Sequence, residues 1–189
     1  MIKPWIFLGA MLLWGCGTGP VAGGSTDTET GAVAGFATRL DGRPVAGATI
    51  LAFRADSTAS APALLARKAT AAPDGSYRLD SLSAGRWTFE FIAPDGYRGL
   101  APSVLIHAGK IDTPHSLLHT PARIRLKEST DTTTPWVAGT AHQGRLVAGF
   151  WVVDSVPAGA PLVVRRGLGS ASQVVARLVL APSQDSLLP

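Results

Sequence analysis

The chain has 189 residues and a formal net charge of +4. It contains 21 glycines and 14 prolines, close to one residue in five, where about an eighth is usual for a soluble domain. So many chain-breaking residues exclude a helical bundle, and an apolar content of 46% excludes wholesale disorder. The single cysteine excludes an internal disulfide. The basic residues are scattered along the chain, which argues against a nucleic-acid partner.

The first 15 residues have the pattern of an export signal. One basic residue, Lys3, precedes an apolar run from Trp5 to Trp14. The run is too short for a permanent membrane-spanning helix, but its length suits the apolar region of a signal peptide. We therefore expect residues 1–15 to be a signal peptide.

The end of this run carries a more specific motif, Leu13-Trp14-Gly15-Cys16. It resembles the lipobox of bacterial lipoproteins, although that motif prefers a small or β-branched residue where Trp14 stands. The resemblance implies cleavage before Cys16 and attachment of lipid to its thiol. Gly17 follows, where an Asp commonly retains lipoproteins in the inner membrane, so the resemblance implies the outer membrane or cell surface. The alternative is an ordinary secretory signal that is cleaved elsewhere.

Residues 16–29 are rich in Gly, Ser and Thr, which predicts a flexible tether. Beyond it, residues 30–127 contain short apolar runs separated by turn signals, including three Asp-Gly pairs. Trp87, Phe89 and Phe91 alternate with polar residues, which is the period of a half-buried antiparallel strand. The apolar runs and turn signals of residues 30–127 predict about seven strands at the spacing of a β-sandwich.

Four blocks of this segment occur in the order and spacing of a known family. They cover residues 31–35, 41–48, 74–79 and 82–87. The segment resembles the carboxypeptidase regulatory-like domain. The resemblance implies an all-β fold, a prealbumin-like antiparallel β-sandwich of about seven strands, and a non-catalytic accessory role.

Residues 128–134 form a Thr-rich linker, and residues 135–182 then repeat part of the preceding pattern. The segment from Asp154 to Gly159 echoes that from Asp80 to Gly85 at an offset of 74 residues. This predicts a degenerate second β repeat of about four strands that packs against the first unit. The alternative is that these strands extend one larger sandwich. Residues 183–189 are expected to be a tail.

No reaction chemistry stands out in the sequence, so we expect a protein that is not an enzyme and has no cofactor or metal. The pair His115 and His119 has zinc-ligand spacing only on a helix, and prolines bracket it. The sequence lacks a Gly-x-Ser-x-Gly motif, and the glycines near residue 167 lack a phosphate-loop signature.

The sequence thus predicts a non-catalytic, membrane-anchored lipoprotein whose sandwich is a surface binding or scaffolding module. Its expected partners are the membrane, through the lipid anchor, and a glycan or an envelope protein. The alternative is a carbohydrate-binding accessory protein with a starch-binding-like sandwich. In that case Tyr97 and Trp136 are the candidate exposed stacking residues, whereas Trp87 and Trp151 are expected in the core.

Overall fold

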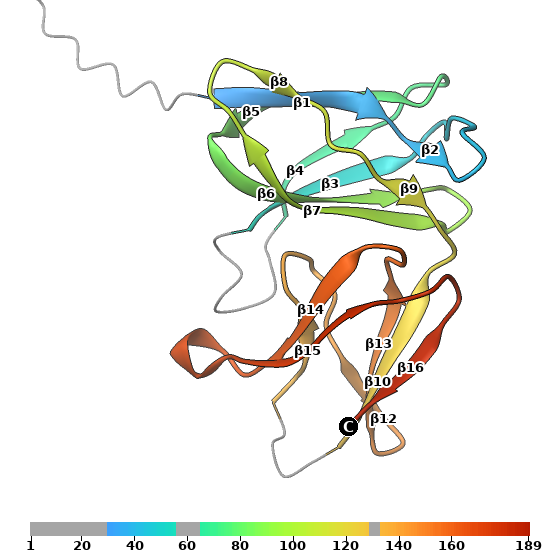
Figure 1. The fold of residues 1–189 in the computed structure, drawn as a ribbon, viewed down its shortest axis with the longest axis vertical. Helices are drawn as coiled ribbons and strands as arrows, with labels where there is room; N and C mark the ends of the chain where they lie inside the picture. Colours follow the sequence, from blue (N-terminus) through green and yellow to red (C-terminus); the bar gives the residue numbers. More distant parts are fainter. Residues whose placement is uncertain (1–29, 56–64, 129–132) are drawn as a thin grey trace, which may run out of the picture.

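The computed structural model describes residues 30–55, 65–128 and 133–189 (Figure 1). These residues form two β-sandwiches that follow one another along the long axis, so the predicted all-β class is confirmed. Within the same ranges no helix is long and apolar enough to cross a membrane. The predicted signal peptide, the tether and Cys16 lie outside the described residues.

The first sandwich has two main sheets, with strand orders β5-β1-β8 and β4-β3-β6-β7. A two-stranded parallel ribbon, β2-β9, leads toward the second sandwich. The strands are β1 (Thr30–Phe36), β2 (Thr38–Arg39), β3 (Thr49–Arg54), β4 (Leu65–Thr70), β5 (Ser76–Ser83), β6 (Gly85–Ile92), β7 (Arg98–Ile106), β8 (Ile111–Asp112) and β9 (Leu117–Leu118).

Alternation along β6 builds the first core. Trp87, Phe89 and Phe91 point inward, as predicted, and all three are buried. They meet side chains of the opposite sheet, and the Tyr77 ring packs edge-on against Phe91 at 5.5 Å between ring centroids. The other face of β6 therefore points away from this core.

The second sandwich also has two sheets, with strand orders β12-β13-β10-β16 and β11-β14-β15. Its core includes Ile124, Leu126, Val153, Leu162 and Val164. The strands are β10 (Ala122–Lys127), β11 (Trp136–Val137), β12 (Arg145–Val147), β13 (Phe150–Val156), β14 (Pro161–Arg166), β15 (Gln173–Val179) and β16 (Asp185–Leu188).

Two boundaries differ from the sequence analysis. Residues 122–127, expected to complete the first sandwich, form β10, which pairs with β13 and β16 in the second. Residues 183–189, expected to be a tail, contain β16, which runs parallel to β10. The alternation within a strand identifies its buried face but does not identify the neighbouring strand, so neither pairing was visible in the sequence.

The two sandwiches repeat the same backbone irregularities at the offset of 74 residues. Ser81 and Ser155 have positive φ angles of 58° and 57°, and Gly75 and Gly149 have φ angles of 79° and 77°. A register shift also interrupts both the β1–β5 and the β10–β13 pairs near these serines. The two units therefore share these irregularities, and β16 pairs in parallel with β10 as β8 does with β1.

The last strand offers a matched pair of variants that tests its place in the sandwich. Leu188 packs against the second core, whereas its neighbour Leu187 is 57% exposed. We expect Leu188→Ala to lower the free energy of unfolding by about 1–2 kcal/mol because it removes apolar burial. Leu187→Ala should change it by less than about 0.5 kcal/mol. Equal, negligible effects in urea unfolding would contradict the pairing of β16.

Candidate functional site at the junction of the sandwiches

The outer face of β6 is covered by the second sandwich. Thr88 and Glu90 point to this face, yet their exposed fractions are only 3% and 2%. Gly139, in the turn after β11, lies against Thr88, and a Cβ atom there would stand 2.8 Å from the Thr88 hydroxyl oxygen. The polar face of β6 is thus an interface between the two units.

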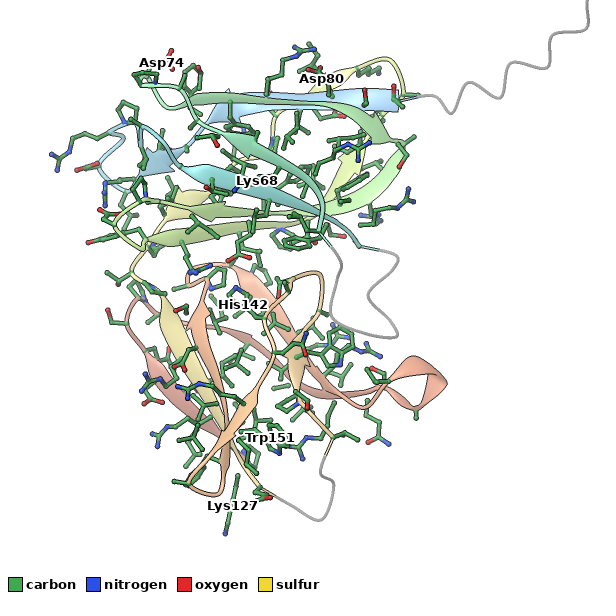
Figure 2. The ribbon with its side chains drawn as sticks, turned by 180° about the vertical axis from the view of Figure 1, so that it is seen from behind. Lys68, Asp74, Asp80, Lys127, His142 and Trp151 are labelled. Atoms are coloured by element: carbon green, nitrogen blue, oxygen red, sulfur yellow. The ribbon has the colours of Figure 1, made fainter. Side chains whose placement is uncertain are left out.

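Glu90 is the charged centre of this interface. Its Oε1 accepts hydrogen bonds from Arg98 Nη1 at 2.6 Å and from His142 Nε2 at 2.9 Å. Arg98 belongs to β7 of the first unit, whereas His142 comes from the second and lies between the sandwiches in Figure 2. Burial alone would raise the pKa of Glu90, but the hydrogen bond and charge of His142, together with Arg98, hold that pKa below its usual value.

Apolar contacts continue across the same face. Leu100 stands directly opposite Glu90 in the β6–β7 register, so the two side chains share one face of the sheet. Leu100 is 5% exposed and belongs to the core of the second sandwich, not to that of the first. The second core therefore extends onto the outer face of the first unit, which couples the two sandwiches.

The tight turn that contains His142 is held by Thr140. The Thr140 hydroxyl donates to the Val137 carbonyl at 2.9 Å and accepts from the His142 amide at 3.1 Å. Thr140 is fully buried. The second unit thus presents His142 to Glu90 from a turn with satisfied hydrogen bonds.

A groove of about 460 Å³ opens beside this interface, and we call it the junction groove. Its walls come from both units: Phe36, His115 and Leu117 from the first, and Ala158 and Pro161 from the second. Phe36 and Leu117 are 60% and 46% exposed, so the groove offers apolar side chains to solvent. A concave surface that combines exposed apolar side chains with two histidines, His115 and His119, suits the binding of a partner.

A second groove, of about 740 Å³, lies on the other side of the β2–β9 ribbon, and we call it the charged groove. Alternation along the ribbon separates the two, because Thr38 and Leu117 line the first whereas Arg39 and Leu118 line the second. Arg39 pairs with Asp95 in the charged groove. The hydrogen bond from Arg39 lowers the pKa of Asp95.

Tyr97, predicted as a stacking residue, lines the charged groove and is partly buried. The Arg39 guanidinium carbon lies 4.5 Å from the centre of its ring, so the cation occupies one face. Tyr97 therefore presents at most one ring face to a ligand.

The prediction that Trp136 is exposed was wrong. Trp136 is 1% exposed, and its indole nitrogen donates to the Gly167 carbonyl at 3.1 Å. The Arg165 guanidinium covers its ring at 5.9 Å. Burial by residues about thirty positions further along the chain prevents Trp136 from stacking on a sugar.

The remaining predicted residues fall in different places. Trp87 is buried in the first core, and Trp151 is partly buried against the second. Of the two bracketed histidines, His115 lines the junction groove, and His119 packs against Gly159 at its edge. Within residues 30–55, 65–128 and 133–189, no group of three acidic, His or Cys side chains is arranged to hold a metal ion. The sequence does not reveal the set of Glu90, Arg98 and His142, because His142 lies 52 residues after Glu90 and belongs to the other unit.

No family model and no curated protein matches the sequence. Among solved structures, the chain is similar to the Bacillus anthracis TIE protein, with 11% identity and a TM-score of 0.39. That match covers 84% of this chain and 33% of the other, so the chain spans about a third of that protein's length.

The shaft pilin SpaA of Lactobacillus rhamnosus GG is 9% identical, with a TM-score of 0.32 over 84% of this chain and 96% of that one. The minor pilin of the Gram-positive pathogen Streptococcus agalactiae is 10% identical, with a TM-score of 0.34 over 84% and 93% of the two chains.

The lowered pKa of Glu90 predicts how the free energy of unfolding depends on pH. Because its folded-state pKa is lowered, Glu90 contributes stability that is fully present above the ordinary glutamate value of 4.5 and is lost as the pH falls through the folded-state pKa. At neutral pH, Glu90→Gln should lower the free energy of unfolding by about 3 kcal/mol, because it leaves the partly buried donors of Arg98 and His142 without their anion.

The difference between wild type and Glu90→Gln should shrink in urea titrations carried out at decreasing pH below 4.5. The exposed pair of Arg78 and Asp80 supplies the control, and Asp80→Asn should have little effect at any pH. A difference between wild type and Glu90→Gln that stays constant with pH would contradict an ionised Glu90 at the interface.

Proposed function

We propose that this chain is a non-catalytic surface module, anchored through lipid on Cys16, whose two sandwiches act as one rigid scaffold for a binding partner. The observation that carries the proposal is the burial of Glu90 between the units. An interface with a satisfied buried charge and a shared core holds the sandwiches in one relative position. The walls of the junction groove come from both units, so this coupling also fixes the shape of the groove.

The side chains that line the junction groove indicate the class of partner that it binds. Phe36, Leu117 and Pro161 supply apolar contacts, and His115 and His119 supply polar groups. We propose an envelope protein partner that inserts an apolar side chain between Phe36 and Pro161. In the charged groove, on the other side of the β2–β9 ribbon, Arg43 pairs with Asp41. These paired charges give the partner polar contacts beside the apolar side chain that it inserts into the junction groove.

The carbohydrate-binding alternative depends on two exposed aromatic rings. Trp136 is buried, and one face of Tyr97 is covered by Arg39. These contacts favour a protein partner over a glycan.

The lipid anchor is tested by metabolic labelling with palmitate in the cell that makes the protein. We expect label on the wild-type chain and none on Cys16→Ser, because the thiol and the adjacent cleavage site direct acylation. The anchored wild type should fractionate with the outer membrane. Unlabelled wild-type protein would overturn the anchor.

The groove is tested by chemical cross-linking in the native envelope, followed by identification of captured proteins. We expect Phe36→Ser to reduce capture of the same partner by roughly tenfold, because it removes a large apolar contact from the groove. Leu146→Ser, which alters a leucine 48% exposed on β12 and outside the groove, is the matched control. Equal capture by both variants would contradict binding in the junction groove.

A further inference from the structure

The hairpin formed by β14 and β15 projects from the second sandwich (Figures 1 and 2). Leu168, in the loop at its end, is 63% exposed. β15 is the outer strand of its sheet, and it exposes Val175, Val179 and the Arg177 side chain. The hairpin thus combines an apolar tip with an apolar and cationic outer strand.

This apolar tip is held in place by hydrogen bonds at its base. Arg165 donates from Nε to the Ser172 hydroxyl at 2.8 Å and from Nη2 to the Ser172 carbonyl at 3.1 Å. The Trp136 indole nitrogen donates to the Gly167 carbonyl at 3.1 Å. Gly167 has a φ of +81°, and a Cβ atom there would stand 2.9 Å from the Ala171 carbonyl oxygen. The loop that carries Leu168 is therefore closely packed at its base, which fixes where Leu168 is presented.

The charge of this region has one sign. The sequence has no acidic residue between Asp154 and Asp185, and within that stretch it has three arginines, Arg165, Arg166 and Arg177. Residues 122–189 have seven basic and four acidic side chains. The hairpin is thus complementary to an anionic surface.

From these observations we infer that the β14–β15 hairpin docks onto the surface of a bilayer that contains anionic phospholipid. Leu168 enters the boundary between the headgroups and the acyl chains, and Arg177 lies among the phosphates. Exposed apolar groups beside cationic ones are what an interfacial site requires. Trp136 and Arg165 act as positioning residues, since they hold the loop and contact no lipid.

The direction of the hairpin agrees with the proposed anchor. In both figures the end of the hairpin and the beginning of β1 lie on the same side of the molecule. A segment of 14 residues, the number from Cys16 to the start of β1, reaches at most about 50 Å when extended. This orientation rests on the proposed lipid anchor, whereas the docking of the hairpin does not.

The test uses the unacylated chain from Gly17 to Pro189, which contains every described residue, so that its outcome is independent of the anchor. The probe is co-sedimentation with vesicles of phosphatidylcholine alone or mixed with phosphatidylglycerol. We expect binding to the anionic vesicles that falls as salt rises. Leu168→Ser should weaken it about tenfold, and Arg177→Glu by at least about fivefold.

Matched controls are Leu105→Ser, which alters a leucine 46% exposed on β7, and Arg67→Glu, which alters an exposed arginine on β4. Both should bind as the wild type does, and circular dichroism verifies that every variant is folded. The inference is overturned by an absence of binding to anionic vesicles, by equal binding to both vesicle types, or by equal losses in hairpin and control variants. It is also overturned by a stable dimer that Leu168→Ser dissociates, because a second copy would then occupy the hairpin.

Discussion

The arrangement of this protein depends on one buried carboxylate between two β-sandwiches. A charged group at this depth is unfavourable unless cations and donors from the protein replace its water. Arg98 from the first unit and His142 from the second supply them, so Glu90 is satisfied only when both sandwiches are in place. The same face of the sheet contributes Leu100 to the second core. Charge and apolar burial therefore favour the same relative position of the units.

Because the two sandwiches are coupled, they form surfaces to which both units contribute residues. The two sandwiches share several backbone irregularities, but each contributes different residues to the junction. Glycine matters most where the units approach one another, since Gly139 lies against Thr88 and Gly159 against His119. The junction groove, the β2–β9 ribbon and the charged groove all lie near this contact. The proposed binding function thus belongs to the pair of sandwiches rather than to either one.

The sequence predicted what local patterns determine. Trp87, Phe89 and Phe91 were correctly placed in the core, because period-two alternation directly reports which face of a strand is buried. The same pattern placed Glu90 on the polar face but contained no information on what covers that face. Trp136 was expected at the surface because it follows a Thr-rich linker, and its burial depends on Arg165 and Gly167. β16 was missed because it is short and its parallel partner, β10, lies about sixty residues earlier.

The central claim is that the two sandwiches form one cooperative unit, and differential scanning calorimetry of the chain from Gly17 to Pro189 tests it most directly. If Glu90 and the shared core couple the units, heating gives a single transition with equal calorimetric and van't Hoff enthalpies. Two separate transitions, or a calorimetric enthalpy about twice the van't Hoff value, would contradict it, because each sandwich would then unfold without the other.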